Sequence, residues 1–236
     1  MEVRLNRITG VDDAIVALRV SKRNINPDIE DALRESYRRY MDHRSIKEET
    51  EFMKDCILSL KKWGSKHITL LKFIDLNFTV YGLHRGGQDD WDSHTKRFDN
   101  RIVRSSTRLA TFGECEKSDY YKDKIMTTAE ACRFLNINLP DSFDNNGNTF
   151  IKVENGYVDI NYKKDKDVLR GLYPLCIPSN FIFSINLAEF AHVYKMRNED
   201  TTANPEVQEL AEKCMKCIEN YPLLGFDKEF ILSIDN

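Results

Sequence analysis

The feature that most constrains the fold is a change in the spacing of apolar residues between positions 48 and 80. Over residues 48–63 apolar side chains recur every three or four positions, which predicts an amphipathic helix with Gly64 as its C-terminal stop. From residue 68 the spacing becomes two, which predicts a long strand, bent near Lys72. A chain that contains both periods in sequence needs a sheet covered by helices.

Shorter segments elsewhere repeat both patterns. The expected strands are residues 3–7, 68–80, 150–162 (a hairpin that turns at Asn155-Gly156) and 181–185. The expected helices are residues 14–21, 28–40, 48–63, 88–98, 118–137, 187–197 and 205–221. Residues 96–108 and 141–148 are expected to be surface loops. The sequence therefore predicts one α+β domain over residues 1–236, with an antiparallel-rich sheet flanked by helices and a hairpin inserted at 140–165.

The charge balance excludes some classes of partner. The 35 Lys and Arg are mixed evenly with 38 Asp and Glu, and the net charge is −3, which argues against a general nucleic-acid or membrane-surface binder. No segment approaches the roughly 18 to 20 apolar residues that span a bilayer. The opening residues MEVRLNRITG lack an export signal, so the six cysteines are expected to be reduced thiols in the cytoplasm.

One local exception to this balance is a basic stretch between positions 96 and 108. It contains five cations and three hydroxyl groups: Lys96, Arg97, Arg101, Arg104, Arg108, Ser105, Ser106 and Thr107. Planar guanidinium groups together with short hydroxyl donors are well suited to hold a phosphate. A solvated basic face balanced by the nearby Asp89, Asp90 and Asp92 explains the same composition. Composition alone leaves both interpretations open.

A second group of candidate residues extends from Val168 to Ala211. Its members follow one another in a fixed order: Arg170, Pro174, Ser179, Ser184, Asn186, His192, Met196-Arg197, Ala203, Asn204, Glu206 and Val207. This order resembles the C-terminal half of the flavin-dependent thymidylate synthases. That family has an Arg before Leu-Pro, then Thr-x-x-x-x-Thr-x-Asn, a helix with a His or Asn and Leu-Arg, and Ala-Gln-x-Glu-Ile.

Earlier segments extend the resemblance. Leu18-Arg19-Val20-Ser21 is similar to the family's Ala-Arg-x-Ser, and Ser106-x-Arg108 matches the end of its signature Arg-His-Arg-x-x-Ser-x-x-x-x-Ser-x-Arg. Lys96-Arg97-Phe98 stands where the Arg-His-Arg of that signature should be. Two further positions depart from the family, because Arg104 replaces an acidic residue and Ala188 replaces an Arg.

The resemblance implies both a reaction and the residues that carry it. It implies transfer of a one-carbon unit from methylenetetrahydrofolate to C5 of dUMP, giving dTMP, with FAD as cofactor and NADPH as co-substrate. By this resemblance dUMP is held by Ser106, Arg108, Arg170 and Arg197, and Arg197 is the catalytic residue that polarises the uracil. FAD would be held by Lys96, Arg97, Asn186 and His192. The resemblance also implies a homotetramer with active sites between subunits, and no metal.

Three other functions fit the same residues. The first is a related modification, such as hydroxymethylation or the use of a different pyrimidine nucleotide. The second is a nucleotide-binding protein that has lost flavin, since the Arg-His-Arg segment departs from the family. The third is a single-stranded nucleic-acid binder that uses the basic stretch, with Trp91 and Phe98 for stacking.

The remaining chemically reactive residues fit structural roles better. Cys214-x-x-Cys217 is half of a zinc motif without a second pair of ligands, and Cys214 belongs to an apolar stripe, which favours a buried thiol. Cys176 has no surrounding pattern that would make it a nucleophile. His67, His84 and His94 have no metal-ligand spacing among them. His192, taken alone, is as well explained as a core histidine.

Overall fold

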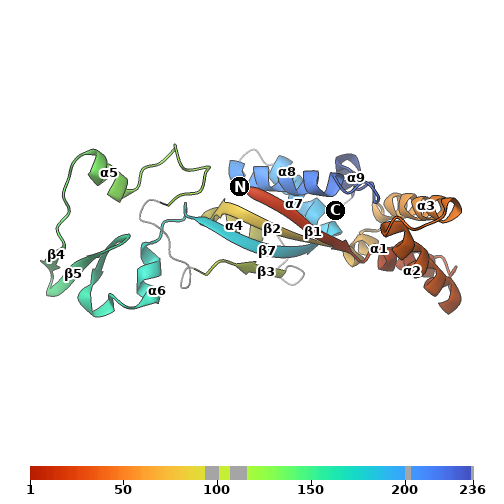
Figure 1. The fold of residues 1–236 in the computed structure, drawn as a ribbon, viewed down its shortest axis with the longest axis horizontal. Coiled ribbons are helices and arrows are strands. Elements are labelled where there is room, and N and C mark those ends of the chain that lie inside the picture. Colours follow the sequence, from red (N-terminus) through yellow and green to blue (C-terminus); the bar gives the residue numbers. More distant parts are fainter. Residues whose placement is uncertain (94–100, 107–115, 200–202, 235–236) are drawn as a thin grey trace. The chain divides into compact units, whose positions relative to one another are not determined.

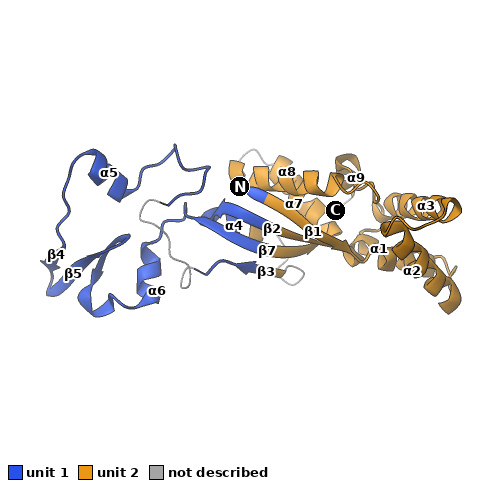
Figure 2. Cartoon of the chain, in the orientation of Figure 1, with its two compact units in different colours: residues 1–2, 80–90, 103–181 blue, residues 3–79, 91–102, 182–236 orange. Residues whose placement is uncertain are grey.

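The computed structural model describes residues 1–93, 101–106, 116–199 and 203–234. The chain divides into two compact units (Figure 2). Unit 1 comprises residues 1–2, 80–90 and 103–181, and unit 2 comprises residues 3–79, 91–102 and 182–236.

The larger sheet has four strands in the order β1-β2-β7-β3 (Figure 1). These strands are β1 (Glu2–Thr9), β2 (Asp75–His84), β7 (Pro178–Asn186) and β3 (Arg101–Arg104). Just beyond β2, Arg85 N donates to Ile177 O at 3.0 Å and Gly86 N donates to Leu175 O at 3.1 Å. The residue numbers of the partners run in opposite directions, so this pairing is antiparallel. The predicted α+β fold with an antiparallel sheet is confirmed.

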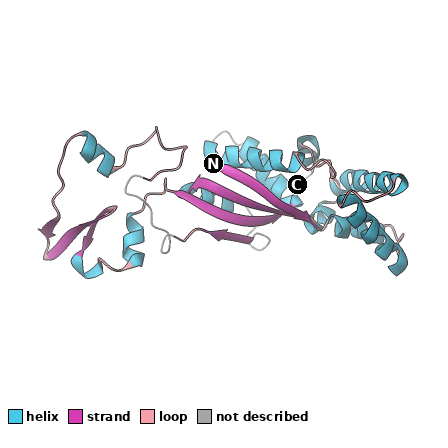
Figure 3. Cartoon of the chain, viewed as in Figure 1, coloured by secondary structure: helices cyan, strands magenta, loops and turns pink. Residues whose placement is uncertain are grey.

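Unit 2 contains most of the described helices, which Figure 3 shows in cyan and Figure 2 assigns to the units. They are α1 (Val11–Ser21), α2 (Pro27–Met41), α3 (Lys47–Gly64), α7 (Leu187–Glu199), α8 (Pro205–Glu219) and α9 (Lys228–Ser233). Helix α2 begins one residue before the predicted Asp28, because Asn26 Oδ1 accepts a hydrogen bond from Ile29 N at 2.9 Å and Pro27 is the first helical residue. The predicted helices at 14–21, 28–40, 48–63 and 187–197 are confirmed.

The core of unit 2 is aromatic at the point where strands and helix meet. Phe78 of β2 stacks on Phe183 of β7 with ring centroids 5.3 Å apart, and on Phe190 of α7 at 6.2 Å. Helix α8 adds the predicted apolar stripe, and its buried members include Val207, Leu210, Ala211, Cys214 and Ile218. The alternating apolar side chains of β2 and the apolar side chains spaced three to four residues apart in α8 therefore face one core.

The predicted strand over residues 68–80 is wrong in its first half. Residues Ile68–Phe73 form the 3-10 helix η1, and β2 begins only at Asp75. Leu70 and Leu71 are buried there, and the Leu71 side chain packs so close to Gly64 that a Cβ at position 64 would lie 2.6 Å from Leu71 Cδ2. Gly64 is the last residue of α3, and its missing side chain leaves room for Leu71, so it does not act as a left-handed stop beyond the helix.

Unit 1 contains a second, three-stranded antiparallel sheet in the order β4-β5-β6. Its strands are β4 (Ser142–Asn145), β5 (Asn148–Val153) and β6 (Gly156–Asp159). The predicted hairpin within 150–162 is present, but Val153 pairs with Gly156, so the turn consists of Glu154 and Asn155 rather than Asn155-Gly156.

The predicted loop at 141–148 is also a hairpin. Asn145 pairs with Asn148, and the turn between them has positive φ at Asn146 (50°) and Gly147 (79°), as a two-residue primed turn requires. The four residues of β4 are all exposed, so no apolar alternation marked this strand in the sequence.

Helices in unit 1 are short. The predicted helix at 118–137 is reduced to α5 (Thr128–Phe134), which begins at a capping box formed by Thr127 and Glu130. Two 3-10 turns, η2 (Ile160–Tyr162) and η3 (Arg170–Leu172), flank α6 (Lys166–Leu169). Helix α4 (Arg85–Ser93) covers the first part of the helix predicted at 88–98, and residues 94–98 lie outside the described part of the chain.

The basic stretch is less irregular than predicted, because residues 101–104 form strand β3.

Across the four described ranges, no helix combines the length and the apolar character that crossing a membrane requires. The five cysteines in these ranges, Cys56, Cys132, Cys176, Cys214 and Cys217, are free thiols.

Candidate functional site at the β7–α7 junction

The junction between β7 and α7 holds two of the motif residues. Asn186 ends the strand with 6% of its surface exposed, and its Oδ1 accepts a hydrogen bond from Glu189 N at 2.9 Å. This bond caps the first turn of α7. Ser184, two residues earlier, is 8% exposed and its Oγ accepts from Asn77 Nδ2 at 2.6 Å. The alternation of the strand places both residues opposite the aromatic face that carries Phe183.

A row of polar side chains crosses the sheet next to this junction. Asn6 Nδ2 on β1 donates to Asn77 Oδ1 and to Thr79 Oγ1 on β2, each at 2.8 Å. With the bond from Asn77 to Ser184, the row runs from β1 to β7. The polar positions of β2 alternate with Leu76 and Phe78, which are completely buried. The period-two pattern of the sequence therefore already indicated which residues of β2 share the polar face.

Helix α7 carries the other two motif residues of unit 2. Arg197 is 3% exposed, and His192 is half-buried. They are five residues apart, which corresponds to about 140° around a helix axis. Helix α7 therefore directs the two side chains to different sides, and a ligand of Arg197 need not touch His192.

The basic stretch is partly neutralised by acidic residues. In unit 2, Arg101 forms an ion pair with Asp75, and in unit 1, Arg104 forms one with Asp89. The interpretation of a balanced surface is thus correct for these two arginines. The expected ligand-binding residues Lys96, Arg97 and Arg108 lie outside the described part of the chain.

Unit 1 contains the remaining two expected substrate residues. Ser106 follows β3 and is half-buried. Arg170 begins η3, and its side chain is 48% exposed, with one guanidinium nitrogen 3.4 Å from Asp167 Oδ1. An ion pair of this length at the surface contributes little, so the guanidinium can exchange Asp167 for a phosphate.

A group of buried polar side chains around α4 was missed by the sequence reasoning. His84 is 3% exposed, and its ring meets Tyr121 edge-on with centroids 4.8 Å apart. A Cβ at Gly87 would lie 2.6 Å from His84 Cε1, so the glycine makes room for the imidazole. Gln88 is completely buried, and neither polar atom of its amide has a hydrogen-bond partner among the described residues. The Gly86-Gly87 pair was the only trace of this cluster in the sequence.

The cysteines considered as reactive groups are held in their neutral form. Burial raises the pKa of Cys176, which is 6% exposed, and raises the pKa of the completely buried Cys214 well above its ordinary value. Within the described ranges, no cluster of three or more His, Cys, Asp or Glu side chains is arranged to hold a metal ion.

The fold and site define an α+β protein in which two of the motif residues, Ser184 and Asn186, lie where strand β7 passes into helix α7, and His192 and Arg197 follow on that helix. The sequence matches the model of the thymidylate synthase complementing protein family over residues 17–222. This match covers most of the chain, so the protein belongs to that family.

Two solved structures share its fold. A crystal structure of the flavin-dependent thymidylate synthase of Helicobacter pylori, complexed with FAD and dUMP, is 15% identical. It aligns with a TM-score of 0.56 over 96% of this chain and 98% of its own. A second structure of thymidylate synthase X from Helicobacter pylori with FAD and dUMP is 14% identical, with a TM-score of 0.56 over 98% and 100% of the two chains. No curated protein matches the sequence.

Proposed function

We propose that this protein is a flavin-dependent thymidylate synthase. It would transfer a one-carbon unit from methylenetetrahydrofolate to C5 of dUMP, giving dTMP, with FAD as cofactor and NADPH as co-substrate. The observation that carries the proposal is the family match over residues 17–222. The shared fold with enzymes solved in complex with FAD and dUMP supports it.

Four residues are proposed to hold dUMP: Ser106, Arg108, Arg170 and Arg197. Arg170 has an exposed guanidinium whose ion pair with Asp167 is long, which suits it to a phosphate. Arg197 is almost completely buried, so its charge acts in a medium of low dielectric, where it stabilises negative charge on the uracil ring more strongly than in water. Arg197 is therefore the residue proposed to activate the base.

The flavin is proposed to contact Asn186 and His192, with Lys96 and Arg97 at its pyrophosphate. Asn186 Oδ1 is used by the cap of α7, which leaves the Nδ2 donor for an acceptor on the flavin. The half-buried imidazole of His192 adds a second donor. Bound flavin supplies the hydride that reduces the transferred carbon to a methyl group.

The organisation of the protein is part of the proposal. Residues 1–236 are proposed to form one domain, in which the hairpin region 140–165 is an insertion. The protein is proposed to act in the cytoplasm as a homotetramer with active sites between subunits.

An absorbance spectrum of the purified protein and an assay with dUMP test the proposal. We expect a flavin band in the blue and dTMP as product. We expect Arg197→Lys to lower activity by about 100-fold or more, because a fixed donor to the developing charge is lost. Arg38→Lys is the matched control, since Arg38 pairs with Glu35 at the surface of α2.

Other outcomes point to the alternative functions. A colourless protein that binds dUMP but cannot be reconstituted with FAD would instead be a nucleotide-binding protein. Mass spectrometry of the products separates methylation from hydroxymethylation and identifies the nucleotide used. A protein that binds single-stranded nucleic acid with a steep salt dependence, and not dUMP, contradicts the proposal.

A further inference from the structure

A cavity of about 360 Å³, which we name the α1–α3 pocket, lies between two helices of unit 2 that Figure 1 shows next to each other. Its lining is one stripe of each helix, continued by two residues after α1: Ile15, Leu18, Arg19, Lys22, Asn24, Phe52, Asp55, Cys56 and Ser59. All of them belong to unit 2, and none is among the residues proposed to bind dUMP or flavin. The volume falls within the range of roughly 300–1,000 Å³ that encloses a small molecule.

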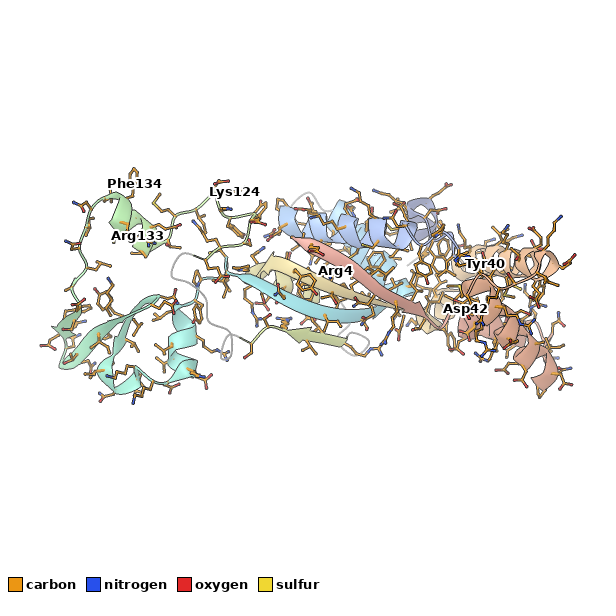
Figure 4. The ribbon with its side chains drawn as sticks, in the orientation of Figure 1. Arg4, Tyr40, Asp42, Lys124, Arg133 and Phe134 are labelled. Carbon is orange, nitrogen blue, oxygen red and sulfur yellow. The ribbon has the colours of Figure 1, made fainter. Side chains whose placement is uncertain are left out.

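The walls of the α1–α3 pocket are held in place by packing within unit 2. In unit 1, residues 119–175 contain a single buried residue, Val158. Helices α1 and α3, in contrast, share many buried residues: Val11, Ala14, Ile15, Val16, Leu18, Met53, Cys56, Ile57, Leu60 and Gly64. At the end of α2, the hydroxyl of the buried Tyr40 donates to Leu223 O at 2.9 Å (Figure 4). The pocket is therefore preformed, and a ligand does not have to order its walls.

Arg19 in this pocket has no carboxylate partner within the described part of the chain. Its Nη2 donates to Cys56 Sγ at 3.6 Å, and its guanidinium carbon lies 5.7 Å from the centre of the Phe52 ring. A thiol sulfur is a weak acceptor, and a guanidinium has five N–H donors. The arginines of α2 differ, because each of them forms an ion pair with a carboxylate: Arg34, Arg38 and Arg39. Arg19 therefore retains donors for an anion.

Lys22 adds a second cation to the same wall. Its Nζ lies 5.1 Å from the centre of the Trp63 ring, again without a carboxylate partner among the described residues. Arg19 and Lys22 are three residues apart, so their side chains lie on one side of the helix end. The backbone oxygen of Arg19, which would repel an anion, accepts hydrogen bonds from Lys22 N at 3.2 Å and Asn24 N at 3.1 Å. The two cations can therefore serve one anionic group.

We propose that the α1–α3 pocket binds a small phosphate monoester with an aromatic body. Arg19 and Lys22 hold the phosphate, and the Ser59 hydroxyl is a further donor on the opposite helix. The ring packs against the apolar part of the lining: Ile15, Leu18 and Phe52. This binding site does not depend on the proposed chemistry of the protein.

The charges of the lining select among anions. A phosphate monoester carries about −1.5 to −2 charges at neutral pH and has three terminal oxygens, so it can use both cations and the hydroxyl at once. A carboxylate has one charge and two oxygens, and it leaves one of these donors without a partner. Asp55 is the acidic residue of the lining, and its charge repels a second phosphate. The pocket therefore favours a monophosphate over a carboxylate and over a diphosphate.

Titration calorimetry of the full-length protein with phenyl phosphate tests the site. We expect Arg19→Gln and Lys22→Gln each to raise the dissociation constant by about tenfold or more, because each loses a charge-assisted hydrogen bond. Arg38→Gln is the matched control, since Arg38 pairs with Glu35 at the surface, and it should leave binding unchanged. Arg170→Gln should also leave phenyl phosphate binding unchanged, which separates this pocket from the proposed dUMP site.

The selectivity of the pocket is measured with two further probes. Benzoate and phenyl diphosphate should each bind about tenfold more weakly than phenyl phosphate. Asp55→Asn should reduce the difference between the monophosphate and the diphosphate, because the repelling charge is removed.

Tryptophan fluorescence gives a second, independent measurement. The chain has two tryptophans, and Trp91 is completely buried, whereas Trp63 lies beside the Lys22 ammonium group. When Lys22 turns from the ring to the phosphate, the emission of Trp63 should change, and this change should be absent in Trp63→Phe. An unchanged dissociation constant in both Arg19→Gln and Lys22→Gln would overturn the proposal. Equal binding of benzoate and phenyl phosphate, or a loss of binding in Arg170→Gln alone, would overturn it as well.

Discussion

At the scale of single residues, Gln88 carries an energetic cost that the fold alone does not explain. Its amide is completely buried, and neither polar atom has a partner among the described residues. A buried unpartnered polar group costs about 1–3 kcal/mol. We therefore expect Gln88→Met, which keeps the shape of the side chain, to raise the free energy of unfolding by about 1 kcal/mol, as measured by urea denaturation. Unchanged or lower stability would show that the amide has a partner beyond the described residues.

Gly10 is a residue at which a single methyl group should be costly. It precedes α1 with φ of 77°, and a Cβ there would lie 2.0 Å from the backbone oxygen of Phe73. The left-handed conformation and the clash both oppose a side chain. We expect Gly10→Ala to lower the free energy of unfolding by about 2–5 kcal/mol in urea. Gly171→Ala, where a Cβ meets nothing within 4 Å, should change stability by less than about 0.5 kcal/mol.

At the scale of elements, α5 should respond to pH through its first turn. Glu130 accepts hydrogen bonds from Lys117 Nζ at 2.8 Å and from Thr127 N at 2.7 Å. The Lys117 bond, followed by the Thr127 backbone bond, lowers the pKa of Glu130 from 4.5 to about 2. A carboxylate whose pKa is lower in the folded state stabilises that state above its unfolded pKa. This stabilisation is lost as the pH falls through the folded pKa.

The expected result is a loss of α5 between about pH 4.5 and pH 2. Hydrogen exchange of the α5 amides, corrected for the intrinsic rate at each pH, should show protection that is constant above pH 5 and falls below pH 4.5. Glu130→Gln should remove this pH dependence and lower the protection at neutral pH. A wild-type profile identical to that of Glu130→Gln would contradict the role of this ion pair.

The sequence predicted an element well when the residues of that element alone carry the apolar pattern or the start residues that identify it. Helix α3 has a continuous apolar stripe, α2 has Asn26 and Pro27 at its start, and α8 has Asn204 and Pro205. The strand predicted at residues 68–73 was wrong because Leu70 and Leu71 are buried in a 3-10 helix that contacts α1, α3 and α7, and not by strand alternation. Strand β4 was missed because all its residues are exposed.

At the scale of the whole molecule, the family and the fold could be predicted from the order of motif residues between Arg170 and Glu206. That order is a local property of the chain, and the strand and helix predicted at 181–185 and 187–197 placed Asn186 between them, as the structure does. The buried polar cluster around His84 and Gln88 could not be predicted, because it depends on the packing of α4 against residues far along the chain. The ion pair between Arg104 and Asp89 was anticipated only as one of two interpretations.

The near absence of buried side chains in residues 119–175 affects how the energetics of this chain should be interpreted. The denaturant slope and the heat-capacity change of unfolding scale with the apolar surface that becomes hydrated. A stretch that hides so little surface within one molecule contributes little to either quantity. Both quantities, measured on a single dissociated chain, therefore describe chiefly the core of unit 2, to which α1, α3 and α8 contribute buried apolar side chains together with β2, β7 and α7.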